Sequence, residues 1–334
     1  MLPKVSSLKV IITDFVADTL EPERRVLQGV ADIEALNAFG EEELVGRIED
    51  ADAVMMYHSL PVTRKTIERL RRCKLIVRCG VGVDNVDHAF AASRGIPVAN
   101  VPDYGTEDVA DSAIGMMLAL TRGIHPLDSA LRAGEGPWSY TPFAPLRRLR
   151  GQTLGIIGLG RIGSACALRA GALGMDVAFY DPYKPDGYDK ALGIRRFEKL
   201  GDLLGQSYVV TLHCPLTDET RHLMNPRTLG LMRDGSYLIN TSRGEVVDIE
   251  ALVPALRSGK LAGAAIDVLP QEPPSGNESL LLAWRDLRDP LRHRIIINPH
   301  SAFYSEEGMM DMRVKGAEAC RRALLGEKIR NRVN

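Results

Sequence analysis

The chain has 334 residues, of which 45% are hydrophobic and 25% are charged, and its formal net charge is −1. This balance gives no broad basic field, so we expect neither nucleic acid nor a membrane surface as a direct partner. No apolar run is long enough to span a bilayer, and the N-terminal segment MLPKVSSLKVIITDF lacks the features of a secretory signal. The five cysteines are widely spaced with no C-x-x-C pair, so we expect a cytoplasmic protein with reduced thiols and no metal site.

The first hundred residues alternate short apolar runs with more polar segments. The apolar runs predict strands at 9–13, 31–36, 53–56, 75–78 and 96–100. Helical segments are expected between them, among them 63–70 and 89–94. Strands that alternate with helices in this way predict a parallel α/β sheet.

A longer helical pattern, rich in Ala, Met and Leu, follows at 106–121. Glu107 and Asp108 place acids in its first turn, where the helix dipole favours negative charge. We expect this helix to connect two domains. Residues 134–151 contain Trp138 and three prolines, and they are predicted to form a loop.

The stretch 154–181 is the one around which the rest of the chain is organised. A predicted strand at 154–157 enters Gly158-Leu159-Gly160-Arg161-Ile162-Gly163, a G-x-G-x-x-G pattern that is followed by a helical pattern and a second strand at 177–180. In such a unit the first glycine permits a tight turn, the second lets the backbone approach a pyrophosphate, and the third lets the helix pack on the strand. The pyrophosphate lies at the helix N-terminus. This order of elements favours a dinucleotide site over a plain βαβ crossover.

Asp181 ends the second of these strands and bears on the choice of dinucleotide. An acid at this place accepts hydrogen bonds from the adenosine ribose hydroxyls. Its carboxylate would repel a 2′-phosphate, and Lys184 is the one nearby cation in Pro182-Tyr183-Lys184. The sequence therefore predicts NAD as cofactor, with NADH preferred over NADPH.

The alternation continues to the end of the chain. Strands are predicted at 208–213, 237–240, 263–268 and 294–298, with helices at 249–258 and 305–325 and a long loop with a short helical piece at 270–290. Because the last helix follows the dinucleotide unit, we expect it to return to the first domain. The predicted domains are therefore residues 1–103 with 305–334, and residues 104–304, joined by two crossings that form a hinge.

Three polar residues follow predicted strands of the second domain: Arg243, Glu272 and His300. In an open α/β sheet, ligands bind at the carboxyl ends of the strands. Reduction of a ketone needs a proton donor, a role that suits histidine near neutral pH, and a carboxylate beside the histidine orients it. Arginine matches a substrate carboxylate. Each of these residues taken alone is more often an ordinary surface group, so their spacing by itself leaves a structural role open.

Six longer segments are distinctive as a set. They are RCGVGVDNVD (78–87), NVPDYGTEDVAD (100–111), GQTLGIIGLGRIG (151–163), INTSRGEVVD (239–248), GAAIDVLPQEP (263–273) and NPHSAF (298–303). In these segments the chain resembles the D-isomer-specific 2-hydroxyacid dehydrogenase family. The branch that it most resembles is that of the C-terminal-binding proteins, NAD-dependent corepressors of animals, through AVMMYHS (53–59), FYDPYKPDG (179–187), VTLHCPLT (210–217) and HSAFYSEE (300–307).

The resemblance implies two Rossmann-like or flavodoxin-like α/β domains with an active-site cleft between them. The domain of residues 1–103 and 305–334 would bind substrate, and that of residues 104–304 would bind NAD. Arg243 would bind the substrate carboxylate and carbonyl, Glu272 would support the histidine, and His300 would be the general acid/base. The residues implied to line NAD are Val81, Gly158, Gly160, Arg161, Ile162, Gly163, Asp181, Cys214, Pro215, Thr220, Thr241, Ser242, Arg243, Asp267 and His300. Those implied to face the substrate are His58, Arg78, Val81, Gly82, Arg243, His300 and Phe303.

Two positions distinguish branches of the family. The formate dehydrogenase branch has glutamine where this chain has Glu272, which disfavours that activity. The corepressors have tryptophan where this chain has Phe303, so the aromatic wall of the substrate site differs. Phosphite and phosphoglycerate oxidation also occur in the wider family and stay open.

We therefore expect an enzyme that interconverts a small D-2-hydroxy acid and its 2-keto acid. The alternative is an NAD(H)-sensing scaffold, resembling the corepressors, with little or no turnover. The resemblance also implies a homodimer formed through residues 106–121 and 134–150.

Overall fold

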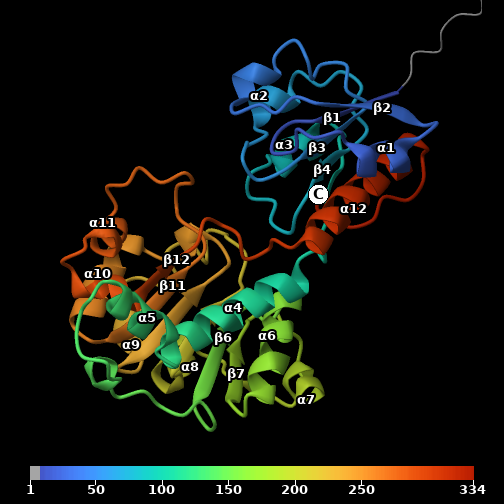
Figure 1. The fold of residues 1–334 in the computed structure, drawn as a ribbon. Helices are drawn as coiled ribbons and strands as arrows, with labels where there is room; N and C mark the ends of the chain where they lie inside the picture. Colours follow the sequence, from blue (N-terminus) through green and yellow to red (C-terminus); the bar gives the residue numbers. More distant parts are fainter. Residues whose placement is uncertain (1–7) are drawn as a thin grey trace, which may run out of the picture. The chain divides into compact units, whose positions relative to one another are not determined.

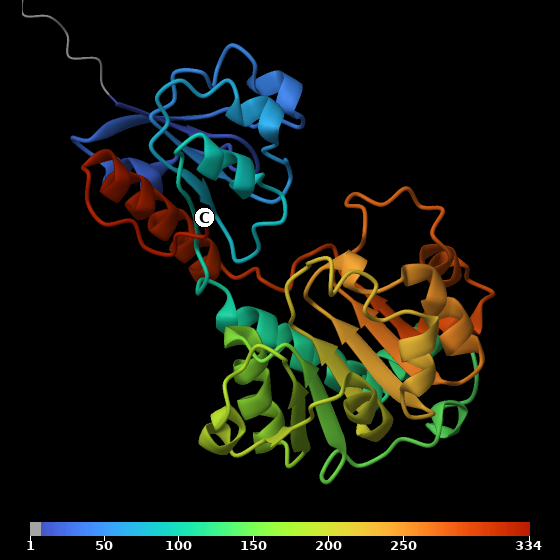
Figure 2. The ribbon, with the colours of Figure 1, turned by 180° about the vertical axis from the view of Figure 1, so that it is seen from behind.

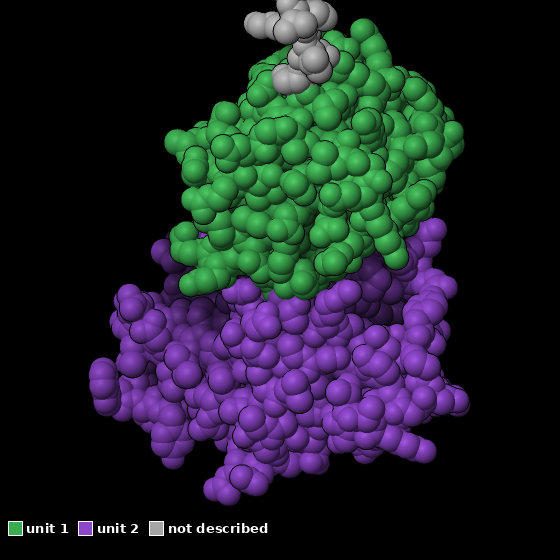
Figure 3. All heavy atoms as spheres, turned by 90° about the vertical axis from the view of Figure 1, so that its right-hand side faces the viewer, with its two compact units in different colours: residues 1–105, 305–334 green, residues 106–304 purple. Residues whose placement is uncertain are grey.

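The computed structural model describes residues 8–334, and its chain divides into two compact units (Figures 1 and 3). Unit 1 comprises Met1–Gly105 and Ser305–Asn334, and unit 2 comprises Thr106–Tyr304. Residues 1–7, the start of the N-terminal segment in which we found no secretory signal, lie outside the described residues. The chain passes from one unit to the other twice, at 105/106 and at 304/305.

Unit 1 contains a parallel sheet of five strands in the order β2-β1-β3-β4-β5. Its strands are β1 (Leu8–Ile12), β2 (Ala31–Ala35), β3 (Ala53–Met56), β4 (Ile76–Arg78) and β5 (Val98–Asn100). Its helices are α1 (Glu21–Leu27), α2 (Arg64–Ile67), α3 (His88–Ser93) and α12 (Glu306–Leu324), with a 3₁₀ turn η1 (Glu41–Leu44). This order is the flavodoxin-like one, and it places the carboxyl ends of all five strands at one edge of the sheet.

Helix α12 brings the end of the chain back onto unit 1, where it packs against α1, β3 and β4. A buried ion-pair network fastens it there. The guanidinium of Arg313 donates from Nε to Glu23 (2.6 Å) and from Nη1 to Asp18 (2.6 Å). Glu23 is fully buried, and the hydrogen bond from Arg313 holds the pKa of Asp18 below its usual value. Arg313 thus joins α12 to the loop that follows β1.

Unit 2 contains a parallel sheet of seven strands in the order β12-β11-β10-β9-β6-β7-β8. The strands are β6 (Thr153–Ile157), β7 (Asp176–Tyr180), β8 (Arg195–Arg196), β9 (Val209–Leu212), β10 (Ser236–Asn240), β11 (Leu261–Ile266) and β12 (Ile295–Ile297). Because β7 lies on one side of β6 and β9 on the other, the chain changes direction across the sheet at β6. This is the Rossmann order, in which ligands bind beside such a switch point.

Helices cover both faces of this sheet (Figures 1 and 2). The bounds of these helices are α4 (Thr106–Thr121), α5 (Ile124–Arg132), α6 (Arg161–Ala172), α7 (Tyr188–Leu192), α8 (Leu200–Gln206), α9 (Pro226–Leu231), α10 (Leu252–Arg257) and α11 (Ser279–Arg285). The 3₁₀ turns of this unit are η2 (Thr141–Phe143), η3 (Gly244–Val246), η4 (Ile249–Ala251) and η5 (Pro290–Arg294).

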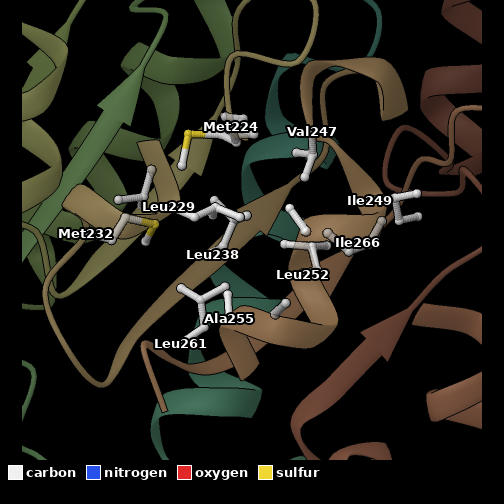
Figure 4. Close-up of a cluster of buried hydrophobic side chains, with 14 of the residues drawn as sticks. Met224, Leu229, Met232, Leu238, Val247, Ile249, Leu252, Ala255, Leu261 and Ile266 are labelled. Atoms are coloured by element: carbon white, nitrogen blue, oxygen red, sulfur yellow. The ribbon is translucent and has the colours of Figure 1, made fainter. Parts of the chain in front are cut away.

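Each face of the sheet has its own hydrophobic core, and alternate residues of one strand enter different cores. On β10, Leu238 joins the core beneath α8 to α11, whereas Tyr237 and Ile239 join the core that includes α4 and α6. Figure 4 shows the first of these cores, with Leu238 lying among side chains such as Leu229 and Leu252. A sheet buried on both faces explains why these strands are continuous apolar runs.

The predicted two-sheet α/β fold is confirmed, and the strand positions agree to within two residues, but several helices differ. The helix expected at 63–70 is a single turn, Arg64–Ile67, capped by the side chain of Thr63. The helix expected at 249–258 begins as a 3₁₀ turn and becomes α-helical only at Leu252. The sequence patterns do not predict α5, α7, α8, α9 and β8. Within residues 8–334, no helix is both long and apolar enough to cross a membrane.

The Arg313 network predicts a large stability loss in the variant Arg313→Met. This change leaves the carboxylate of Glu23 buried without its cation, which costs on the order of 3–5 kcal/mol. We expect a clear shift of the urea unfolding midpoint to lower concentration. The matched control on the same helix is Lys315→Met, which removes partly exposed ion pairs with Asp311 and Asp103 and costs less than about 1 kcal/mol. Equal shifts in the two variants would contradict the assigned role of Arg313.

Candidate active site

The glycine turn after β6 has the geometry of a dinucleotide loop. Gly158 has φ +89°, and a Cβ on it would lie 2.6 Å from the backbone nitrogen of Cys214, so only glycine fits. A Cβ on Gly163 would lie 2.2 Å from the carbonyl oxygen of Gly158, so this glycine lets α6 approach the turn. At Gly160, by contrast, a Cβ would meet no atom of residues 8–334 within 4 Å, its chain neighbours aside. Packing within the protein therefore does not require glycine at position 160. A pyrophosphate lying close to the backbone there would require it.

The turn leads directly into α6, for which Gly160 is the N-cap without a side-chain capping bond. Arg161 and Ile162 are the first residues of this helix, where backbone N–H groups have no intrahelical acceptor. Together with the helix dipole, such N–H groups favour a phosphate. The residues of the turn therefore fit the pyrophosphate of a dinucleotide.

Asp181 lies at the carboxyl end of β7, and both of its carboxylate oxygens accept backbone hydrogen bonds. The N–H of Leu159 donates to Oδ2 (2.9 Å), and the N–H of Tyr183 donates to Oδ1 (3.0 Å). A carboxylate can accept about four hydrogen bonds, so capacity for ribose hydroxyls is left. The ammonium of Lys184 lies over the ring of Tyr188, 4.8 Å from its centroid.

The loop after β9 lies against the glycine turn through the contact of Gly158 with Cys214. Burial raises the pKa of the Cys214 thiol to about 11, so this thiol stays protonated near neutral pH and is no nucleophile. The hydroxyl of Thr220 donates to the carbonyl of Pro215 (2.6 Å) and accepts from the N–H of Thr217 (2.8 Å), which closes the loop on itself.

The loop after β10 carries Arg243, and Asn240 shapes it. The side-chain amide of Asn240 donates to the carbonyl of Arg243 (2.9 Å), and its oxygen accepts from the N–H of Ser242 (3.0 Å). The guanidinium of Arg243 donates from Nη1 to the carbonyl of Ser242 (2.8 Å). The hydroxyl of Thr241 is buried without a hydrogen-bond partner in the described chain, which suits a residue predicted to line NAD.

The loops after β11 and β12 bring Glu272 and His300 together. Nδ1 of His300 lies 2.6 Å from Oε2 of Glu272. Because an ionised carboxylate only accepts, Nδ1 carries the hydrogen. The other oxygen of Glu272 accepts from the N–H of Leu269 (2.8 Å), which fixes the carboxylate. The ring of Phe303 stands edge-on to that of His300, with centroids 6.0 Å apart.

Asp267, at the end of β11, fixes the loop that carries the histidine. Its side chain is 1% exposed and accepts from the N–H groups of Ser301 (2.9 Å) and Ala302 (3.1 Å), while its carbonyl accepts from the N–H of His300 (2.7 Å). Burial raises its pKa, against the hydrogen bonds from these N–H groups. His300 itself has φ +52°, a conformation uncommon outside glycine. The contact of Asp267 with NAD stays a prediction.

Gly244 joins the arginine loop to the glutamate loop. A Cβ on Gly244 would lie 2.0 Å from the carbonyl carbon of Leu269 and 2.3 Å from the nitrogen of Pro270. Gly244, the residue after Arg243, therefore contacts the backbone of Leu269, whose N–H donates to Glu272. In this way unit 2 places the predicted arginine and the Glu272–His300 pair on adjoining loops at one edge of its sheet.

Four predicted site residues lie in unit 1. His58 follows β3, and Arg78, Val81 and Gly82 lie at or just after the end of β4. The side chain of Arg78 is 6% exposed, and its guanidinium donates from Nη1 to the carbonyl of Cys79 (3.1 Å). Val81 is 38% exposed. The carbonyl of Val81 accepts from the side-chain amide of Asn100 (2.6 Å), which fixes this loop.

The sequence analysis missed the residues that position these groups. Asn240 belongs to the segment before Arg243 without any pattern that marks its role, and Asp14 and Phe15, which follow β1, lie in none of the distinctive segments. Arg243 and His300 are predicted as site residues because each is a polar residue that follows a parallel strand at its carboxyl end. The same criterion applies to Asp14. No pattern indicated the roles of Leu269 or Gly244, because these depend on contacts between loops.

The comparisons with known proteins agree with this geometry. Residues 114–302 match the family model "D-isomer specific 2-hydroxyacid dehydrogenase, NAD binding domain". The chain belongs to the D-isomer-specific 2-hydroxyacid dehydrogenase family, as its motifs had predicted.

Two curated relatives and one solved structure illustrate the likeness. The chain is 36% identical over 327 residues to D-3-phosphoglycerate dehydrogenase of Methanocaldococcus jannaschii, covering 98% of this chain and 59% of the relative. It is 34% identical over 310 residues to C-terminal-binding protein 1 of Caenorhabditis elegans, covering 91% of this chain and 42% of the relative. The chain thus spans about half the length of these relatives. D-lactate dehydrogenase from Aquifex aeolicus, complexed with NAD and lactic acid, superposes with a TM-score of 0.82 at 28% identity, covering 95% of this chain and 96% of that one.

The open surroundings of Gly160 give a test that separates cofactor binding from folding. Gly160→Ala adds a methyl group that clashes with no protein atom, so we expect an unchanged thermal unfolding temperature. Its methyl group would occupy the approach of the pyrophosphate, and we expect NADH affinity, measured by fluorescence titration, to fall by about tenfold or more.

The matched control is Gly171→Ala, in the same helix and also without protein atoms within 4 Å of the added carbon. This variant should bind NADH as the wild type does. If Gly160→Ala also binds normally, the glycine turn has no close contact with the cofactor.

Proposed function

We propose that this protein is an NAD-dependent oxidoreductase that interconverts a small D-2-hydroxy acid and its 2-keto acid. The observation that carries the proposal is the Glu272–His300 hydrogen bond of 2.6 Å in the same unit as a glycine turn suited to a dinucleotide. Family membership supports it, and so do the relatives whose names include lactate and phosphoglycerate dehydrogenases.

His300 acts as the general acid in the direction of reduction. When bound, NADH supplies a hydride to the carbonyl carbon of the substrate. The C=O π bond becomes a C–O single bond, and Nε2 of His300 gives its proton to the oxygen. Nδ1–H stays bonded to Glu272, whose carboxylate orients the ring so that Nε2 is left for the substrate. In oxidation the same nitrogen takes the hydroxyl proton as a general base.

Arg243 binds the carboxylate of the substrate, next to the carbonyl that is reduced. A guanidinium offers a planar fork of donors that matches a carboxylate and can also polarise the adjacent carbonyl. The bonds of Asn240 to the backbone of residues 242 and 243 set the direction in which this side chain leaves the sheet edge. We propose that His58, Arg78, Val81, Gly82 and Phe303 complete the substrate site.

The residues around Asp181 support a preference for NADH over NADPH. The carboxylate accepts the ribose hydroxyls and would repel a 2′-phosphate at the same position. Lys184 is the nearby cation in sequence, and its ammonium lies on the ring of Tyr188, a cation–π contact that competes with any phosphate. Thr241, Ser242 and the loop from Cys214 to Thr220 provide the rest of the proposed cofactor site.

The test is NADH oxidation against a panel of 2-keto acids, followed by absorbance. We expect turnover on a subset of the panel and slower turnover with NADPH. In His300→Ala the rate should fall by about 10²–10⁴-fold because the proton donor is lost, while NADH still binds. The matched control, His88→Ala on α3 of unit 1, should keep the wild-type rate.

Absence of turnover across the panel, with NADH binding demonstrated by fluorescence, would overturn the enzymatic proposal. It would favour the second candidate, an NAD(H)-sensing scaffold, which the likeness to a C-terminal-binding protein supports. An NADH-dependent pull-down of peptide partners without turnover would be its positive sign. Loss of both turnover and NADH binding in His300→Ala would show that this residue supports the cofactor site and is not the acid alone.

We also propose a homodimer formed by the region of α4, α5 and residues 134–150. Side chains there are exposed although apolar: Ile124 is 61%, Trp138 91% and Tyr140 67% exposed. A cavity of ≈ 320 Å³ lined by Leu127, Leu131 and Phe143 lies among them. Such exposed apolar surface marks an interaction site.

Sedimentation at micromolar concentration tests this proposal. The wild type should have the mass of a dimer, and Trp138→Ser should shift the equilibrium towards monomer because a large exposed ring leaves the interface. The control Leu168→Ser changes a residue of α6 that is 68% exposed and should leave the mass unchanged. A monomeric wild type would refute the proposal.

A further inference from the structure

Phe15, the third residue of the loop after β1, has an unusual conformation. Its φ is +69°, which for a bulky side chain is a rare and strained value. Residues held in such conformations cluster at functional sites. The ring is 40% exposed at the edge of the sheet where the carboxyl ends of the unit 1 strands lie.

The ring of Phe15 is packed against the loop that carries His58. Its centroid lies 4.6 Å from that of His58, at an interplanar angle of 58°. It lies 5.4 Å from that of Tyr57, whose side chain is fully buried. The exposed part of Phe15 is therefore a rigid apolar surface adjoining a residue already predicted to face the substrate.

Asp14 holds this arrangement in place. Its carboxylate is buried and accepts from the N–H of Tyr57 (2.8 Å) and of Ser59 (2.9 Å), and from the hydroxyl of Thr13 (2.7 Å). The bonds from Tyr57 and Ser59 join the loop after β1 to the loop after β3. At the other end of the same loop, Asp18 accepts from Arg313. The strained conformation of Phe15 is thus fixed from both sides.

The charges around the exposed ring of Phe15 favour an apolar substrate side chain over a phosphorylated one. A phosphorylated side chain needs several donors or cations beyond those that bind the substrate carboxylate. Phe15 offers none, and its neighbour Asp14 carries a buried carboxylate. His58, which contacts Phe15, adds a single imidazole, and the guanidinium of Arg78, the other predicted substrate-facing side chain that can carry positive charge in this unit, is directed by bonds to Cys79 and Asn85. A branched or aromatic side chain would instead gain apolar contact.

We propose that Phe15 is a specificity-determining residue whose ring, with that of His58, receives the side chain of the 2-keto acid and selects a branched or aromatic group over a phosphorylated one. This inference rests on the proposed function. It sets the chain apart from the relative named for phosphoglycerate, despite the likeness of the two sequences.

The experiment compares kcat/KM for phenylpyruvate, 2-ketoisocaproate, pyruvate and phosphohydroxypyruvate in the wild type and in Phe15→Gly. Glycine adopts φ +69° without strain, so the loop keeps its conformation while the ring is removed. For the wild type we expect the two large apolar substrates to exceed phosphohydroxypyruvate by at least about tenfold. In Phe15→Gly, kcat/KM for these two should fall by about tenfold or more, with pyruvate within about threefold of the wild type.

The control Phe39→Ala changes a ring of the same unit that is 84% exposed and follows β2, and it should leave all four values unchanged. NADH affinity and thermal unfolding should be those of the wild type in both variants, and Phe15→Leu, which keeps an apolar side chain, should restore part of the preference. An equal fall for all four substrates, or phosphohydroxypyruvate as the best substrate, would overturn the inference. A wild type that reduces none of the four, or any other 2-keto acid, would refute the proposed function itself.

Discussion

The contact between Gly158 and Cys214 is the constraint on which the cofactor site depends. Strands β7 and β9 flank β6 on opposite sides. The loops after β7 and β9 therefore diverge at the switch point, and the turn after β6 lies between these two loops. It does so because Gly158 has no side chain and adopts a positive φ, which allows its Cα to lie against the backbone at Cys214. The same turn donates from Leu159 to Asp181. Residues from three loops are therefore held around the start of α6.

The sequence was sufficient to predict the two parallel sheets and most of their strands, because strands buried on both faces are continuous apolar runs such as 53–56. It also led to the glycine turn and to Glu272 and His300, since both follow predicted strands. Short helices such as α8 and α9, of seven and six residues, lack a periodic pattern long enough to recognise. The positioning contacts, among them those of Asn240, Asp14 and Gly244, could not be predicted, because they form between segments distant in the chain.

The two units solve the same physical problem in similar ways. In unit 2 the carboxylate of Asp267 accepts from the N–H groups of Ser301 and Ala302, and in unit 1 that of Asp14 accepts from those of Tyr57 and Ser59. Both aspartates are almost fully buried at the carboxyl end of a strand, and each binds the backbone of the loop after the neighbouring strand. A charged acceptor makes stronger hydrogen bonds than a neutral one, so two such bonds fix a short loop effectively.

A residue with positive φ lies next to one partner of each of these hydrogen-bonded pairs. His300 immediately precedes Ser301, and Phe15 immediately follows Asp14. Strain of this kind costs on the order of 1–3 kcal/mol and persists only where the surroundings determine the conformation. The hydrogen bonds to the carboxylate determine the conformation of the loop and so direct the ring that the loop carries. For His300 the directed ring is the proposed proton donor. By the same physical argument, the role proposed for the Phe15 ring is contact with a ligand, since the loop holds a 40% exposed ring in a conformation that glycine would adopt without strain.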